Sequence, residues 1–157
     1  MHPDVLAFLK NQRVSVFAIE MLDGAPHGST VHFAHTESPP TFIILTETKY
    51  WKAEPLHGRQ ESRATMVIGF EEGPNSRTLQ MDGIAHVFTP AEAHLKEIYL
   101  AKFPNVRAKL NEPDDFFFTF TPTWWRFTDW TRPEGKTIYL SDGSVTVKEK
   151  VNSLKVS

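Results

Sequence analysis

The chain has 157 residues, a length that suits one domain with a substantial hydrophobic core and is too short for two. Its formal net charge of −2 and pI of about 6.4 argue against binding to nucleic-acid backbones, which requires a basic surface. The absence of cysteine excludes disulfides, thiolate metal sites and a cysteine nucleophile. Because no apolar run is long enough to span a membrane and we find no secretory signal, we expect a soluble, cytoplasmic protein.

The first predicted elements are a short helix and a β-hairpin. Asp4 is a candidate cap for the helix. Residues 13–22 and 26–34 have the composition and alternation of strands. Between them, Asp23-Gly24 predicts a type I′ turn, in which both residues have positive φ.

The next stretch combines a strand with a candidate anion site. Residues 36–40 contain two prolines and are predicted to be a loop outside any sheet. Residues 41–46 form an apolar run that ends in Thr46, and a short segment of helical composition follows with Lys49 and Lys52. At such a junction, backbone N–H groups, hydroxyls and ammonium groups can converge on a phosphate. We predict a phosphate pocket here; the alternative is a core strand followed by two solvated lysines.

Two strands and a helix are predicted in the middle of the chain. Residues 63–70 and 78–88 read as strands joined by a turn at 71–76. Gly83, inside the second strand, predicts a bulge or the close approach of another backbone. A capping box that begins at Thr89 predicts the start of a helix.

The last third of the chain is rich in aromatic strand residues. Residues 116–121, 124–130 and 136–140 are predicted strands, and residues 141–157 are predicted to be an edge strand or a loose tail. Six or seven strands joined by successive hairpins predict a mainly β (α+β) fold. We expect an antiparallel, closed or nearly closed barrel with helices at its ends, formed by residues 1–140.

Histidines and tryptophans provide further candidates for function. The sequence has no Gly-x-Gly-x-x-Gly, Walker or Gly-x-Ser-x-Gly motif. His32 and His35 are three residues apart, which on a strand places them on opposite faces and argues against a metal site. Of Trp124 and Trp125, one can enter the core while the other faces a dimer partner or a flat ligand; core packing alone is the alternative.

The order of these features resembles the pyridoxamine 5′-phosphate oxidase-like, FMN-binding split-barrel superfamily over residues 5–139. The resemblance is carried by the Asp23-Gly24 hairpin, the strand that ends in Thr46, Lys52 six residues further on, and the segment Gln80-Met81-Asp82-Gly83-Ile84-Ala85. It implies an antiparallel split β-barrel of six to seven strands. It also implies a homodimer that binds FMN in a groove at its interface.

The resemblance assigns roles to individual residues. Trp51 and Lys52 would hold the FMN phosphate, but better-known members have arginine where this chain has Trp51, so Lys49 or Arg63 could substitute. Thr46 would contact FMN. The remaining candidates would lie along the isoalloxazine ring, and four of them come from the second strand: Ser29, Thr30, Val31 and His32. The glutamine that usually touches the ring falls at Thr78 here, so Gln80 would take its place. The partner chain would contribute Trp124 or Trp125, of which Trp125 is taken as the site residue.

The resemblance implies an FMN-dependent oxidoreductase that acts on a small-molecule redox substrate. The protein's part in flavin chemistry is to bind the phosphate and orient the ring, so no catalytic side chain is predicted. Pyridoxamine phosphate is a poor substrate candidate because no Arg-x-His motif follows Trp130. The alternatives are a non-enzymatic module that binds or senses a flavin, a deazaflavin or haem, and a dimeric barrel without a ligand.

Overall fold

The computed structural model describes residues 1–69, 76–111 and 113–149. Its helical elements are α1 (Pro3–Lys10), η1 (Trp51–Ala53), α2 (Glu54–Arg59), η3 (Pro90–Glu92), α3 (Leu95–Lys102) and α4 (Pro104–Arg107). Its strands are β1 (Val14–Glu20), β2 (Pro26–His32), β3 (Ala34–Glu37), β4 (Pro40–Glu47), β5 (Glu61–Ile68), β6 (Arg77–Val87), β7 (Asp115–Asp129), β8 (Gly135–Leu140) and β9 (Val145–Glu149). Phe70, most of the turn predicted at 71–76 and residues 150–157 of the predicted tail lie outside the described residues. None of the helices in the described ranges is long and apolar enough to cross a membrane.

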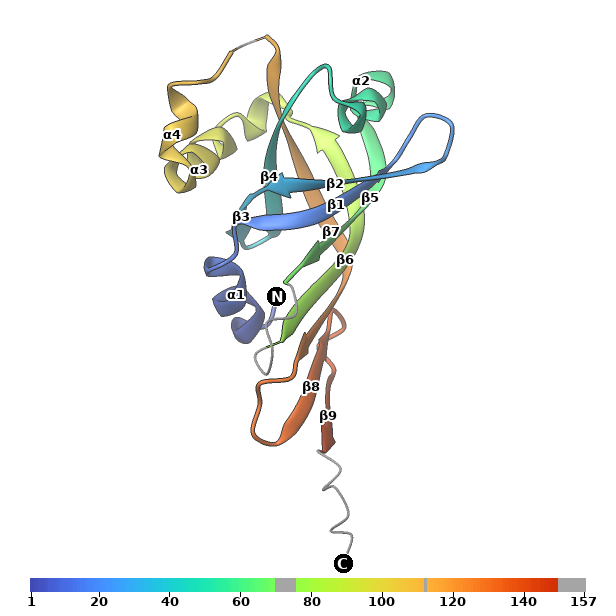
Figure 1. The fold of residues 1–157 in the computed structure, drawn as a ribbon, viewed down its shortest axis with the longest axis vertical. Helices are drawn as coiled ribbons and strands as arrows, with labels where there is room; N and C mark the ends of the chain where they lie inside the picture. The colour runs from blue at the N-terminus through green and yellow to red at the C-terminus, as the bar shows by residue number, and fades with distance from the viewer. Residues whose placement is uncertain (70–75, 112, 150–157) are drawn as a thin grey trace, which may run out of the picture.

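The strands form one antiparallel sheet that curls into a split barrel (Figure 1). Hydrogen-bonded neighbours follow the order β2-β1-β5-β6-β7-β4-β3, while β8 pairs with β7 and β9 with β8. β2 and β3 end this path, yet only Phe33 separates them in the chain, so the sheet must curve until its two ends meet. The predicted mainly β, antiparallel split barrel is confirmed.

The long strand β7 is shared by several neighbours. It pairs with β6 along one edge, and along the other edge first with β4 and then with β8. The prediction of two strands interrupted near Pro122 was wrong, because Pro122 lies within β7 opposite Gly83, where the register shifts. A Cβ atom at Gly83 would lie 2.1 Å from the backbone oxygen of Thr121. The bulge and the close backbone approach predicted at Gly83 are therefore both confirmed.

The proline-rich segment predicted as a loop belongs to a hairpin. Glu37 pairs with Pro40 and Thr36 with Thr41, which joins β3 to β4. Pro40 is the first residue of β4, a position where a strand tolerates the missing N–H. Thr36 Oγ1 donates a hydrogen bond to the Pro39 carbonyl (2.6 Å) and fastens the turn. Proline composition was therefore a poor guide to pairing here.

Two hydrophobic clusters hold the elements together. The first fills the barrel, and its largest fully buried side chains are Phe17, Phe33, Phe42, Phe118, Phe120 and Phe127. The second contains Ile43 of β4, Phe117 of β7 and Tyr99 of α3. Full burial of one such side chain is worth about 1.5–3 kcal/mol, so these aromatic residues supply much of the stability of the fold.

Two predictions about caps and turns were wrong in detail. The N-cap of α1 is His2 rather than Asp4, since His2 Nδ1 accepts the Asp4 N–H (3.2 Å). Gly24 has positive φ but Asp23 does not, so the hairpin has a type I turn closed by a left-handed glycine instead of a type I′ turn. The capping box at Thr89 is present, but it caps η3, and α3 begins only at Leu95.

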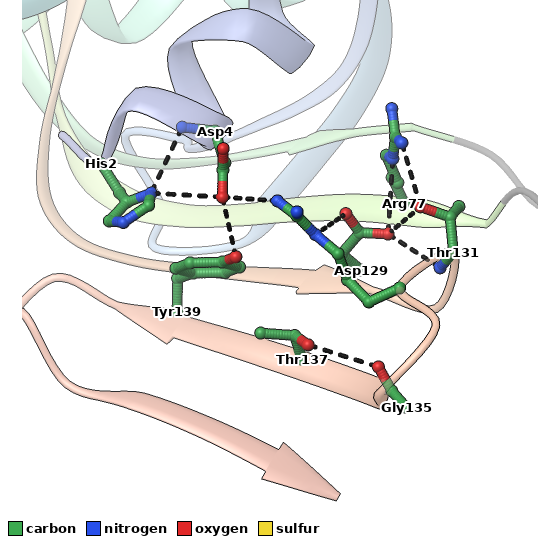
Figure 2. A network of polar contacts seen from close by, with 9 residues as sticks. His2, Asp4, Arg77, Asp129, Thr131, Gly135, Thr137 and Tyr139 are labelled. Atoms are coloured by element: carbon green, nitrogen blue, oxygen red, sulfur yellow. Dashed lines mark hydrogen bonds and ion pairs between the residues drawn. The ribbon is translucent and has the colours of Figure 1, made fainter. Parts of the chain in front are cut away.

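A polar network ties α1 to the end of β7 (Figure 2). Asp129 accepts hydrogen bonds from the backbone N–H and the hydroxyl of Thr131 (2.8 and 2.6 Å). It also accepts bonds from Nε of Arg132 (3.2 Å) and Nε of Arg77 (3.4 Å). Arg132 pairs in addition with Asp4 of α1. We call this set the α1 network; it fixes the first helix to a part of the chain more than 120 residues away.

Burial and hydrogen bonding act in opposite directions on the acid of this network. Burial raises the pKa of Asp129, but the bonds from Thr131 and the charge of Arg77 outweigh burial and hold the pKa below its usual value. The carboxylate is therefore the favoured form of Asp129 in the folded protein. On the neighbouring strand β8, burial raises the pKa of Tyr139, whose hydroxyl donates to Asp4 (2.8 Å).

Candidate functional site

The barrel is open between β2 and β4, and η1 lies beside the opening. β2 pairs with β1, and no strand pairs with its other edge within the part of the chain that the structure describes. β2 contacts both β4 and η1, and its arrowhead in Figure 1 ends beside β4. We call the region between the free edge of β2, the end of β4 and η1 the barrel mouth. A free strand edge carries unpaired N–H and C=O groups, so the mouth offers backbone hydrogen bonds to a ligand.

The four predicted ring contacts on β2 divide between the two faces of the strand. Val31 is buried in the barrel cluster, and Ser29, two residues away, is partly buried on the same face. Thr30 and His32 are exposed on the opposite face. Of these four residues, Ser29 and Val31 are therefore the two that can meet a ligand from the inner side of the mouth.

Two hydroxyls of the mouth are buried without a hydrogen-bond partner. Thr46 has the same orientation on β4 as Phe42 and Ile44, which belong to the barrel cluster, and it is almost fully buried. Thr46 Oγ1 and Ser29 Oγ have no partner; among the described residues the other buried side-chain atoms in this state are Ser15 Oγ and Arg126 Nε. An unsatisfied buried polar group costs about 1–3 kcal/mol, so two of them at one opening suggest a ligand that completes them.

Lys52 of η1 supplies the positive charge of the mouth. It is partly buried, and its Nζ lies 4.8 Å from the centroid of the Tyr50 ring. Burial lowers the pKa of Lys52, and the carboxylate of Glu47 offsets only part of this effect. No carboxylate in the described part of the chain comes within ion-pair distance of Lys52. Lys52 is thus a half-buried cation that a bound anion would stabilise.

Lys49 and the start of α2 attract an anion less than Lys52 does. Lys49 is exposed and already paired with Glu47, which raises the pKa of Lys49. The strand does not continue directly into a helix, as the sequence prediction assumed; η1 intervenes, and α2 has only six residues. Glu54 in the first turn of α2 places a negative charge there. The attraction for an anion therefore comes from Lys52 and not from a helix terminus.

A hollow of about 590 Å³ opens next to the mouth, between the β1–β2 hairpin and η1. Its lining includes Leu22 and Asp23 of the hairpin, His27 of β2, and Lys49, Tyr50, Trp51 and Glu54. The side chain of Trp51 is 74% exposed, and its ring lies 5.8 Å from the ring of His27. We call this feature the Trp51 hollow. Sequence reasoning missed it, although the adjacent aromatic residues Tyr50 and Trp51 were a signal for it.

The remaining predicted site residues lie away from the mouth. Gln80 is exposed on β6, three strands from β2 in the sheet order. Arg63, a suggested substitute for Trp51, is exposed on β5 and pairs with Glu20. Trp125 is 9% exposed and belongs to the barrel cluster, whereas Trp124 is 40% exposed. Trp124 is therefore the tryptophan of this pair that a partner chain can reach.

A second concavity, of about 430 Å³, lies on the outer face of the sheet. Its lining combines small and apolar residues of three neighbouring strands, Ala18, Ala64, Gly83 and Ile84, with the charged side chains of Glu20, Arg63 and Asp82, and Thr123 lies at the same site. Trp124 follows Thr123 and pairs in register with Asp82, so this exposed tryptophan stands next to the concavity. We call it the outer-face slot.

Two of the histidines, His35 and His86, have structural surroundings. His35 is partly buried against the Phe42 ring (6.0 Å between centroids), and burial lowers the pKa of His35. His86 contacts Glu92 (2.8 Å) and the hydroxyl of Thr119 (3.0 Å), as expected for a structural residue. In the described ranges, no three His, Asp or Glu side chains group in a way that could hold a metal ion.

No protein-family model matches the chain, and no curated protein matches its sequence. Solved structures do match its fold. A pyridoxamine 5′-phosphate oxidase-related, FMN-binding protein from Nostoc punctiforme superimposes with a TM-score of 0.66 at 13% identity, over 96% of this chain and 97% of the other. A putative pyridoxamine 5′-phosphate oxidase from Listeria innocua gives 0.61 at 18% identity, over 82% and 97%.

A haem protein has the same fold. HutZ, the haem storage protein of Vibrio cholerae, superimposes with a TM-score of 0.62 at 15% identity, over 77% of this chain and 89% of the other. At identities this low, the shared feature is the fold and not the ligand. The split-barrel architecture is thus common to this chain, to an FMN-binding protein, to a putative pyridoxamine 5′-phosphate oxidase and to a haem protein.

Proposed function

Because the chain has the split-barrel fold of the pyridoxamine 5′-phosphate oxidase-like proteins, we propose that it binds FMN at the barrel mouth and acts as an FMN-dependent oxidoreductase. The observation that carries this proposal is the pair of buried, unpartnered hydroxyls, Ser29 Oγ and Thr46 Oγ1, on strands that border the same opening as Lys52. Hydroxyls and a half-buried ammonium group are the donors that a phosphate requires.

The residues of the mouth suit a phosphate group in charge and in hydrogen bonding. Lys52 lacks a carboxylate within ion-pair distance among the described residues, and a negatively charged phosphate would compensate the cost of burying its charge. Ser29 and Thr46 would donate to phosphate oxygens. Val31 and the free edge of β2 offer an apolar contact and backbone groups to the polar rim of a flat ring.

When bound, a flavin supplies the redox chemistry by accepting and returning hydride equivalents. The residues of this chain then have three tasks: Lys52 neutralises the phosphate, Ser29 and Thr46 fix its position, and Val31 shields one side of the ring. None of these tasks requires a side chain that gains or loses a proton.

We also propose a homodimer formed through the outer-face slot. The exposed Trp124 stands beside a concavity that is lined by small residues and by Glu20, Arg63 and Asp82, so a protruding aromatic side chain and a slot lie next to each other on one surface. A two-fold axis between two copies would place each Trp124 in the slot of the other chain. A large aromatic side chain in a complementary slot is the usual anchor of such an interface.

The first test is the spectrum of the protein as purified, followed by titration of ligand-free protein with FMN. We expect flavin absorption bands, quenching of FMN fluorescence on binding, and reduction of the bound flavin by NADH or NADPH in the presence of an acceptor. Tight binding without turnover would favour the alternative, a binding or sensing module. A Soret band in place of flavin bands would instead favour haem, as the HutZ likeness allows.

The second test addresses the dimer. In Trp124→Glu, a charge replaces the proposed anchor, and we expect sedimentation velocity to shift from dimer to monomer. Trp130→Glu is the matched control, because Trp130 is equally exposed (39%) but lies beyond the end of β7. A wild-type monomer, or a dimer that survives Trp124→Glu, would overturn the proposed interface.

A further inference from the structure

The Trp51 hollow contains aromatic surface that a phosphate at Lys52 does not use. Trp51 is the most exposed of the large apolar side chains in the described residues, and with His27 it forms an aromatic corner. Tyr50, also exposed, lines the same hollow. Exposed aromatic residues that gather around a concavity indicate recognition of a flat ring.

The hollow lies next to the proposed phosphate site, and Tyr50 connects the two. Tyr50 belongs to both, since its ring lines the hollow and lies 4.8 Å from Lys52 Nζ. Trp51 precedes Lys52 in the same 3₁₀ turn. A ligand whose phosphate is held by Lys52 can therefore extend into the hollow. Its volume of about 590 Å³ is within the range of sites that enclose a small organic molecule.

The charges of the lining narrow the class of the ring. Asp23 and Glu54 line the hollow, and each presents carboxylate oxygens that accept hydrogen bonds. Lys49 lines it as well and brings a cation close to the entrance. The carboxylates suit a flat ring with an exocyclic amino group that donates hydrogen bonds, and they disfavour a ring with an anionic substituent.

We propose that the Trp51 hollow binds an adenine ring, so that the full ligand of this chain is FAD, with its FMN half in the barrel mouth. Trp51 would stack on the adenine, Glu54 would accept a hydrogen bond from its amino group, and Lys49 would exchange its ion pair with Glu47 for one with the second phosphate. The inference rests on the proposed function, since it extends the same flavin beyond Lys52. It also explains the aromatic residue at position 51, which a phosphate ligand alone does not use.

The test compares the dissociation constants of FMN and FAD for the full chain, measured by calorimetry on ligand-free protein. We expect FAD to bind about tenfold more tightly than FMN, since stacking of one base on an aromatic side chain is worth this factor or more. In Trp51→Ala the affinity for FAD should fall about tenfold, while that for FMN changes less than twofold. Trp51→Phe should retain most of the preference, because it keeps a ring to stack on.

Controls separate the outcomes. Trp130→Ala removes an equally large exposed ring outside the hollow and should leave both constants unchanged. Equal affinity for the two flavins, or an equal loss for both in Trp51→Ala, would overturn the adenine subsite while leaving FMN binding intact. If neither flavin binds, the proposed function fails and the subsite fails with it. Because Trp51 is exposed, its truncation should not alter the unfolding transition, which checks that the variant is folded.

Discussion

The α1 network and the barrel mouth are both partly buried polar regions, but in the described part of the chain the polar groups of the network have hydrogen-bond and ion-pair partners and those of the mouth do not. In the network, the carboxylate of Asp129 has two guanidinium groups and two donors from Thr131 as partners. In the mouth, the hydroxyls of Ser29 and Thr46 have none, and Lys52 has no ion pair within the described residues. A region that only stabilises the fold gains from complete pairing, whereas a region that receives a ligand keeps its pairing capacity free.

The largest expected effect is on stability, from removing the centre of the network. Asp129→Ala leaves Arg77 and Arg132 without their shared carboxylate and should lower the free energy of unfolding by about 2–4 kcal/mol, measured by urea denaturation. Asp142→Ala is the control: Asp142 accepts a similar bond from the N–H two residues on, but it is exposed, and its loss should matter little. Equal effects of the two substitutions would show that the network contributes nothing beyond a local turn.

The largest effect on binding is expected at Lys52. Lys52→Met keeps the aliphatic stem and removes the charge, so the affinity for FMN should fall by a factor that corresponds to about 1.5–3 kcal/mol, measured by fluorescence titration. The stability of the ligand-free protein should not decrease, because a half-buried charge without an ion pair is lost. Lys49→Met, in the same segment but already paired with Glu47, should change the affinity for FMN only slightly. If Lys49→Met proves as harmful as Lys52→Met, the phosphate is not at Lys52.

Thr46 gives the most direct contrast between the two kinds of region. Thr46→Val preserves the shape and removes the unpartnered hydroxyl, so we expect ligand-free protein of equal or slightly higher stability, together with FMN affinity lower by about 1 kcal/mol. Thr119→Val is the matched control on β7, where the buried hydroxyl contacts His86. That substitution should destabilise the fold by about 1–3 kcal/mol, as judged by chemical denaturation. A loss of stability in Thr46→Val would mean that its hydroxyl has a partner.

The smallest expected effect is on the stability of the fold at acidic pH. The pKa of Asp129 is lower in the folded chain than in the unfolded chain, so its contribution is complete above the unfolded value of about 4 and is lost as the pH falls through the folded value. We expect the thermal midpoint of the wild type to decrease below about pH 4 more steeply than that of Asp129→Asn. Parallel curves for the two proteins between pH 7 and pH 2.5 would contradict this assignment.

The sequence was sufficient for the features that depend on neighbouring residues. Strand alternation, the Asp23-Gly24 hairpin and the need for glycine at position 83 all follow from local geometry, and the barrel follows from the order of the hairpins. The capping box was also found, although it caps η3 and not α3. Thr46 and Lys52 were chosen as candidate site residues because the sequence places one at the end of a strand and the other in the short segment of helical composition that follows; their role in a site stays a prediction.

The features that the sequence could not provide depend on distant contacts. Asp4 was assigned a local role as a helix cap, whereas it bonds to Arg132 and Tyr139. Alternation showed that Trp124 and Trp125 point to opposite faces, but not which of them faces the core; that depends on the register of β7 against β6. The Trp51 hollow was missed for the same reason, since the β1–β2 hairpin forms its opposite wall.

The single strand β7 reaches both the barrel mouth and the α1 network. Near its start, Phe116 pairs with Thr46 at the mouth, and its last residue is Asp129 of the α1 network. Amide hydrogen exchange along this single strand therefore reports on both regions in one experiment. Ligand entry should slow exchange at the Phe116 end, and loss of the α1 network should speed it at the Asp129 end, so that each event is located by the position of the affected amides.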